Sequence, residues 1–382
     1  MSKLDPAREY SPNPNILEVR ASDYLKRLAP STASTARALS EHEVVELHSI
    51  GRRAILWAAV AGIVSGALIG GFEIFVHQRS LEPELSWWDQ LPTWVIFFAV
   101  VGVVSAAEIA FLYLNALRAV ARISRLGEVP LAGGGFQELV ARGLARAALE
   151  FSNPTTRVFG MDPYAYAAIW RLTVKNLLYK TKVGVSSFIL RVSLRRILGR
   201  MTLRGLIPLL AAPLYAVWNA IVTYRLLRAA RLRALGPIAI DEAVSRLAAH
   251  RAELSDEAVT VTIEGIGELM MRAMDTHPNY VYLLGRLIEI FKLDVESIEV
   301  RWAKTRTQLA SLAPGEREHV LDMLVVAALL ARHVREPQRD LLRDAHARAQ
   351  LDFRPDALAP LRARLLAGRP ISADELRRVR EA

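Results

Sequence analysis

Two long apolar runs constrain this chain more than any other feature of its sequence. The first covers residues 54–76, where Glu73 is the only acidic or basic side chain, and the second covers residues 93–117, which only Glu108 interrupts. At 1.5 Å of rise per residue, a helix of about 20 residues crosses a hydrocarbon layer of about 30 Å. The sequence therefore predicts a transmembrane helical hairpin, and two core helices of a soluble domain are the less favoured interpretation.

The charges around the two runs predict which ends lie in the cytoplasm. Five arginines lie directly outside the runs: Arg52, Arg53, Arg118, Arg122 and Arg125. The loop between the runs, residues 77–91, holds one Arg and three acidic residues. Because Lys and Arg concentrate in cytoplasmic loops, both ends of the hairpin are expected inside and the loop outside. Trp87, Trp88 and Trp94 cluster at the predicted outer boundary, where amphipathic rings favour the headgroup zone.

Small residues recur every four positions on both runs and give each helix a smooth face. They are Gly62, Gly66 and Gly70 on the first run and Gly102, Ala106 and Ala110 on the second. Small residues let helix backbones approach closely in lipid. We expect the two faces to pack against each other within the hairpin. A homo-oligomer through the same faces is the alternative.

Two acidic side chains fall inside the predicted membrane segments. Glu108 lies about 15 residues, or roughly 22 Å, from the outer end of the second run. A carboxyl group at this depth is costly, and it suggests either an ion or proton path in an oligomer or a hydrogen bond to a neighbouring helix. Glu73 lies close to the interface and is expected to reach headgroups or water. Two helices alone enclose no path, so the hydrogen bond is the favoured interpretation.

The middle of the chain, residues 127–236, is strongly basic. Residues 163–240 hold 13 Lys or Arg and no Asp or Glu, within a chain of net charge +10. Such an excess points to an anionic partner surface. Residues 188–204 are predicted to form a basic amphipathic helix at the membrane interface. The arginines expected to contact anionic phospholipids are Arg191, Arg195, Arg196, Arg200, Arg204, Arg225, Arg228, Arg231 and Arg233.

One further apolar run, residues 205–224, is uncharged for 20 residues. Its length would allow a crossing, but arginines flank it on both sides, and Pro208 and Pro213 interrupt helical hydrogen bonding near its start. A membrane-embedded hairpin or a buried core helix is therefore favoured over a third span, which stays open as the alternative.

Two segments remain. Residues 1–50 are predicted to be a polar, partly disordered N-terminal segment, and residues 237–382 are predicted to form a soluble all-α domain. Turn signals with Pro and Gly separate the helical patterns, and alternating strand patterns are absent from the sequence. The predicted helices cover residues 238–250, 256–274, 278–291, 294–310, 316–334, 337–350, 355–366 and 372–380.

A resemblance to a known family lies in residues 316–352. The helix Leu-Val-Val-Ala-Ala-Leu-Leu, a short break and the helix Glu-Pro-Gln-Arg-Asp-Leu-Leu are similar to a TerB-like (tellurite-resistance-type) helical domain. Such domains usually carry an acidic loop between these helices, which implies metal binding. This chain has Ala331-Arg332-His333-Val334 there, so the resemblance implies a helical scaffold for protein contact. The whole arrangement is similar to uncharacterised bacterial membrane proteins that join a hydrophobic hairpin to such a tail.

The sequence contains no known catalytic or cofactor-binding motif. It has no Cys and no nucleotide-binding, metalloprotease or hydrolase signature. His42 and Glu46 could meet on one helix face as metal ligands, but a solvated charged face is the favoured interpretation. The carboxylates of Glu264 and Glu268 are interpreted in the same way. We therefore expect no catalytic, cofactor or metal site, and no nucleic-acid partner.

Together these patterns predict a non-enzymatic protein of a bacterial inner (cytoplasmic) membrane, multi-pass, with both termini in the cytoplasm. The hairpin would anchor it, the basic region would contact anionic phospholipids, and the C-terminal domain would recruit a cytosolic or membrane protein partner. A homo-oligomer is possible. The alternative function is a subunit of an oligomeric transporter or channel that uses Glu108 within the membrane.

Overall fold

The protein is helical throughout the part that the structure describes. The computed structural model describes residues 5–29, 36–80, 87–168, 170, 207–295 and 298–380. Within these residues the only β pairing is a single antiparallel bridge between Val158 and Met161. The predicted all-α fold is confirmed for this part of the chain.

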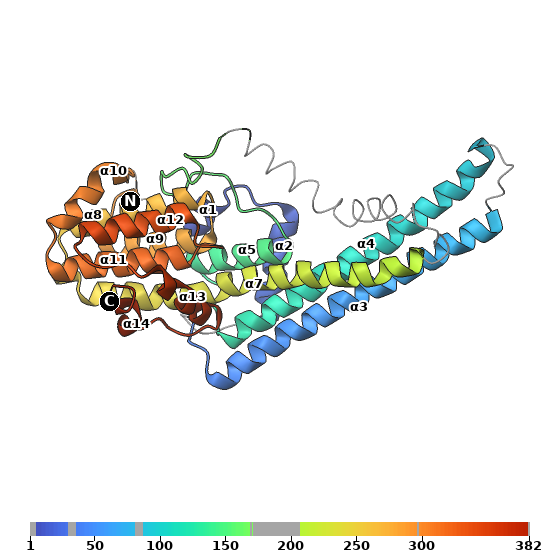
Figure 1. The fold of residues 1–382 in the computed structure, drawn as a ribbon, viewed down its shortest axis with the longest axis horizontal. Helices are drawn as coiled ribbons and strands as arrows, with labels where there is room; N and C mark the ends of the chain where they lie inside the picture. The colour runs from blue at the N-terminus through green and yellow to red at the C-terminus, as the bar shows by residue number, and fades with distance from the viewer. Residues whose placement is uncertain are drawn as a thin grey trace.

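Figure 1 shows an elongated molecule in which three long helices extend away from a bundle of shorter ones. The helices of the first half of the chain are α1 (Pro6–Tyr10), α2 (Ile16–Leu28), α3 (Glu41–Ser80), α4 (Trp87–Leu126), α5 (Gly135–Ala148) and α7 (Ile207–Ala249). The long ones are α3, α4 and α7, and they lie side by side. The two predicted membrane runs are the distal parts of α3 and the greater part of α4.

The helical bundle is built from short helices that follow α7. They are α8 (Asp256–Ala273), α9 (Pro278–Phe291), α10 (Trp302–Thr305), α11 (Pro314–Leu329), α12 (Glu336–Arg348), α13 (Leu358–Leu366) and α14 (Ala373–Arg377). Short 3₁₀ turns cover Arg251–Glu253, Arg306–Ala310 and Pro355–Ala357. Capping residues fix several boundaries: the Ser255 hydroxyl accepts from the Ala258 amide at 3.2 Å where α8 begins.

The predicted helix over residues 294–310 is not continuous: residues 298–301 are not helical, and α10 begins at Trp302. The carboxylate of Glu264 explains this boundary: it accepts a hydrogen bond from the Arg301 amide at 2.8 Å and from the Thr305 hydroxyl at 2.6 Å. Glu264 and Glu268 are both buried, so their interpretation as a solvated face is also wrong. Glu268 pairs with Arg272 at 2.8 Å.

Helix α7 belongs to both hydrophobic cores of the protein. Leu226, Leu227 and Leu235 lie in the core that α2, α4 and α5 share, whereas Ile240 and Val244 lie in the core of the helical bundle. The helix continues through Pro237, where the sequence predicts a domain boundary. A proline removes one donor from the helical ladder. The carbonyl that loses this donor is that of Arg233, and the Leu232 carbonyl next to it accepts from the side-chain amide of Asn279 at 2.7 Å.

The small-residue face of α3 packs against α7. A Cβ atom added to Gly62 would lie 2.7 Å from the carbonyl oxygen of Tyr215, and one added to Gly66 would lie 2.7 Å from the Cα atom of Ala212. Gly70 on the same face is buried. This close backbone approach differs from the prediction, which paired the face with the small residues of the second run.

The corresponding face of α4 has no such neighbour among the residues that the structure describes. A Cβ atom added to Gly102 would meet no atom within 4 Å, and Ala106 and Ala110 are exposed. The predicted zipper between the two small-residue faces is therefore not formed, because α7 occupies the face of α3 that the second run was expected to fill.

Candidate functional site

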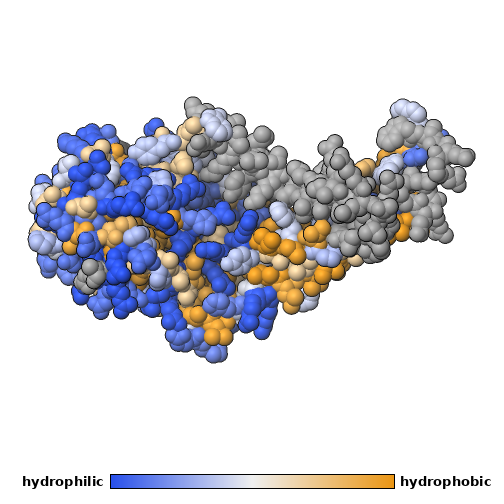
Figure 2. All heavy atoms as spheres, viewed as in Figure 1, coloured by the Kyte–Doolittle hydropathy of each residue, from blue (hydrophilic) through white to orange (hydrophobic). Residues whose placement is uncertain are grey.

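The three long helices present a continuous apolar surface to the outside of the molecule. Helices α3 and α4 are each long and apolar enough to cross a membrane, yet only 33% and 11% of their most apolar stretches are buried inside the structure. A core helix of a soluble protein would be mostly buried. The exposed side chains include Leu56, Trp57, Val64 and Leu68 of α3, Val95, Ile96 and Val103 of α4, and Leu214, Val217 and Ile221 of α7. Part of this surface is visible in orange in Figure 2.

Aromatic rings gather at the distal end of this surface. Phe72 of α3 stacks on Phe97 of α4 with ring centroids 6.2 Å apart, and Trp94 meets Phe97 edge-on at 5.9 Å. Trp88, nearly two turns before Trp94, is exposed. Glu73 is half-buried in the same region. This end therefore combines apolar rings with a few polar atoms, as interfacial aromatic belts do.

A buried polar pair lies in the middle of the apolar segment. The side-chain amide of Asn219 in α7 donates to a carboxylate oxygen of Glu108 in α4 at 2.7 Å, and both residues are buried. Nearer the bundle, Asn115 of α4 donates to the Ala54 carbonyl of α3 at 2.8 Å. Both contacts join different helices, so in the structure Glu108 holds α4 to α7.

Exposed arginines surround the three helices at the end of the apolar surface nearest the bundle. We call this set the arginine collar: Arg52 and Arg53 of α3, Arg118 and Arg122 of α4, and Arg225 and Arg228 of α7. The Asn115–Ala54 contact and the approach of Arg231 to Gly51 show that the three helices reach this level together. None of the six side chains forms an ion pair or hydrogen bond with the described residues.

The structure divides the arginines for which lipid contact is predicted. Arg225 and Arg228 belong to the collar, but Arg231 donates to the Leu47 carbonyl at 2.8 Å, and buried Arg233 donates to Asn153 at 2.8 Å. These two side chains hold helices together. The other five, with the rest of the predicted basic helix, lie outside the described residues: Arg191, Arg195, Arg196, Arg200 and Arg204.

A cavity of about 320 Å³ opens beside the collar, where α7 meets the helical bundle. Its apolar wall is formed by Trp218, Ile221 and Val222 of α7. Its polar wall includes Arg225 and the loop between α11 and α12, which supplies Arg332 and Arg335. These three arginine side chains form no ion pair with the described residues. The loop between α11 and α12, where the sequence predicts a TerB-like domain, is thus basic and faces this cavity.

The wall of the cavity is positively charged around buried His277. Burial, followed by the positive charges of Arg233, Arg362 and Arg332, lowers the pKa of His277 well below its usual range. Its ring nitrogen Nδ1 accepts from the Asn279 amide at 3.3 Å and caps α9. The imidazole is therefore neutral near pH 7, and the excess positive charge of the wall comes from the arginines.

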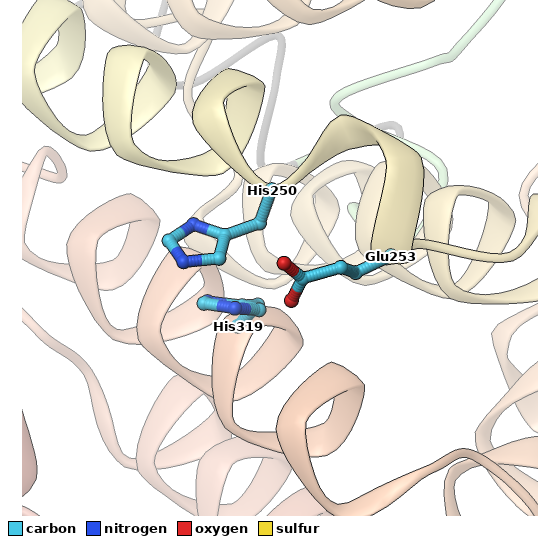
Figure 3. A group of neighbouring side chains, drawn as sticks. All are labelled: His250, Glu253 and His319. Atoms are coloured by element: carbon cyan, nitrogen blue, oxygen red, sulfur yellow. The ribbon is translucent and has the colours of Figure 1, made fainter.

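A second group of polar side chains lies at the opposite end of α7. His250, Glu253 and His319 approach one another so that one ligand atom of each lies within 4.8 Å of the others (Figure 3). Residues 250 and 319 are far apart in the sequence, so only the packing of α11 against the end of α7 reveals the group. His42 and Glu46, the pair that sequence reasoning weighed, are both exposed.

No match to this chain was found among protein-family models, curated proteins or solved structures. The TerB-like resemblance of residues 316–352 therefore stays a prediction, and the argument for function rests on the geometry above.

Proposed function

We propose that the protein is a membrane-anchored scaffold of a bacterial inner membrane, which holds its helical domain against the anionic inner leaflet. In this proposal α3 and α4 span the bilayer, and α7 enters it beside them. The observation that carries the proposal is the exposed apolar surface of three helices that ends at the arginine collar. Apolar side chains above and unpaired cations below are the pattern expected at a cytoplasmic membrane boundary.

The depth of α7 follows from its contacts with α3. Ala212 faces Gly66, which lies twelve residues beyond Ala54, or about 18 Å into the apolar segment. Since α7 starts at Ile207, it would enter most of the way across a layer of about 30 Å. This supports a membrane-embedded helix for residues 207–224.

Electrostatics would hold the soluble domain close to the lipid. Each Lys or Arg near an anionic leaflet contributes about 1 kcal/mol, so the six collar arginines provide a substantial attraction. The cavity beside the collar has an apolar wall and a cationic wall, which suits the headgroup and first methylenes of one anionic phospholipid. The soluble helices α11–α14 would then present their outer faces to a cytosolic partner.

Cysteine labelling in intact cells tests the membrane topology. The chain has no native Cys, so a single Ser86→Cys or Ser311→Cys substitution gives one reactive thiol. A membrane-impermeant maleimide should label position 86 from outside, and position 311 only after permeabilisation. Labelling of position 311 in intact cells would overturn the cytoplasmic placement. A protein that sodium carbonate extracts from the membrane would overturn the anchoring itself.

A further inference from the structure

The group at the end of α7 has the donors and the spacing of a metal site. His250 follows the last residue of α7, Glu253 closes the 3₁₀ turn after it, and His319 comes from α11. Figure 3 shows the Glu253 carboxylate directed toward the two imidazole rings. The ring centroids of His250 and His319 are 4.5 Å apart. Three elements thus bring two imidazoles and a carboxylate to one point.

The hydrogen bonding of His250 prepares it as a ligand. Its Nδ1 atom lies 3.0 Å from the Arg246 carbonyl, which can only accept, so Nδ1 carries the proton. The lone pair is therefore on Nε2, free for a metal ion, in the arrangement that orients most metal-binding histidines. The ring of His319 forms no hydrogen bond with the described residues, so its nitrogens are not committed to another partner.

The charges around the group favour a bound cation. The positive charge of Arg380, which acts on His319, is balanced by Asp322 at 2.9 Å and Glu318 at 3.3 Å. Glu253 is exposed and supplies the negative charge of the group.

We propose that His250, Glu253 and His319 bind a divalent transition-metal ion, with Zn²⁺ as the best fit. Two imidazoles and one carboxylate are a ligand set that Zn²⁺ takes at bond lengths of about 2.0–2.2 Å, with water in the fourth position. Ligand atoms at these bond lengths are about 3.4 Å apart in a tetrahedron. The exposed side chain of Glu253 can close the remaining distance. Mg²⁺ and Ca²⁺ prefer oxygen ligands only.

The site would have a structural consequence that is independent of the membrane proposal. The bound ion would fasten the end of α7 to α11, and the two helices otherwise contact each other through the apolar core that they share. Metal binding of this kind adds its binding free energy to the stability of the folded state. We therefore expect the metal to raise the melting temperature of the helical bundle.

Calorimetric titration of the full chain in detergent micelles with Zn²⁺ tests the site. The wild-type protein should bind one ion per chain, and His319→Ala and Glu253→Gln should each weaken binding at least about tenfold, or about 1.4 kcal/mol. Glu253 is exposed, so its substitution cannot act by unfolding the protein. His333→Ala replaces an exposed histidine in the loop after α11 that is not part of the group. It is the matched control and should bind Zn²⁺ as the wild type does.

Two further measurements make the result decisive. Co²⁺ should give the intense visible absorption of a four-coordinate site in the wild type, and Glu253→Gln should lose it. Zn²⁺ should raise the melting temperature of the wild type and leave that of His319→Ala unchanged. If the wild type binds no Zn²⁺ at micromolar concentration, or if His319→Ala binds it as tightly as His333→Ala does, the proposal is wrong.

Discussion

Single buried polar side chains in this protein are held by partners from distant helices. Fully buried Glu18 of α2 pairs with Arg146 of α5 at 2.5 Å, and the Tyr10 hydroxyl donates to Asn153 at 2.9 Å. Burial raises the pKa of Tyr10 to about 12, so this hydroxyl stays protonated. Removing one partner of such a pair strands the other in an apolar environment, which costs more than the bond itself contributes.

The stability of the helical bundle depends on pH through His346. Its ring is buried in α12 and burial lowers its pKa from 6.5 to about 4. The unfolded state therefore binds a proton that the folded state does not, so stability is complete above pH 6.5 and falls as the pH drops toward 4. In His346→Leu, the decrease in the free energy of unfolding at low pH should be smaller by about 2–3 kcal/mol. Urea unfolding at pH 7.5 and pH 5 measures it.

The control for this prediction is His42→Leu, which removes an exposed histidine and should leave the pH dependence as it is in the wild type. If His346→Leu shows the same loss of stability between pH 7.5 and pH 5, other groups account for it.

Glu108 and Asn219 allow the packing role of the buried carboxyl group to be separated from transport. Glu108→Gln keeps an oxygen that accepts from the Asn219 amide, whereas Glu108→Leu removes it. We expect Gln to preserve stability and Leu to cost about 1 kcal/mol, the usual size of a hydrogen bond between membrane helices. Unfolding in mixed detergent micelles measures the difference. Loss of a cellular activity with Gln at full stability would instead favour the alternative function, an ion or proton path.

At the scale of elements, the contact of α3 with α7 organises the apolar part of the molecule. Gly62 and Gly66 let the two backbones touch, and the Glu108–Asn219 bond brings α4 to the same helix. In lipid, where apolar side chains gain nothing by leaving the solvent, such close packing supplies much of the association. The exposed small face of α4 contributes nothing to it.

A matched pair of glycine substitutions tests this contact. Gly62→Val would push a side chain into the backbone of Tyr215 and Ala216, and overpacking of this kind costs about 1–3 kcal/mol. Gly102→Val has open space and should leave stability unchanged. Thermal unfolding of the two variants in the same detergent compares them. A larger effect at Gly102 would show that the α4 face packs against another copy of the chain.

The chain's sequence could predict the helices better than their partners. The apolar runs of α3 and α4, the Ser255 cap and the Pro278 start follow from local patterns, which act through neighbouring residues. The pairing of Gly62 with Tyr215, the interruption before α10 by Glu264 and the meeting of His250 with His319 all join residues far apart in the chain. No local signal specifies such contacts. The collar could be predicted in part, because its arginines lie next to the apolar runs in the sequence and their position does not depend on a contact with a distant residue.

At the scale of the whole molecule, charge is sorted along the long axis. Many arginines of the bundle are balanced locally, as Arg348 with Asp344 at 3.1 Å and Arg364 with Glu375 at 2.7 Å illustrate. Within the described residues the collar arginines have no such partners. Unpaired charge is thus concentrated where the apolar surface ends, which is the pattern that the proposed membrane boundary requires.

Anionic lipid should stabilise the protein through the collar. Phosphatidylglycerol added to detergent micelles should raise the melting temperature of the wild type more than phosphatidylcholine does, and high salt should reduce the difference. The double variant Arg118→Gln/Arg122→Gln should lose part of this gain. Arg339→Gln/Arg343→Gln, which removes ion-paired arginines of α12, should keep it. Equal loss in both variants would show that total charge matters and the collar does not.

Because α7 runs unbroken from the apolar segment to the His250 group, it is a lever about 64 Å long. A helix of this length turns small angles into large displacements: a tilt of about 5° at one end moves the other by about 5–6 Å. Bilayers of different thickness impose tilts of this size on their helices. A change in bilayer thickness would therefore displace the far end of α7 within the bundle, and no ligand would be needed.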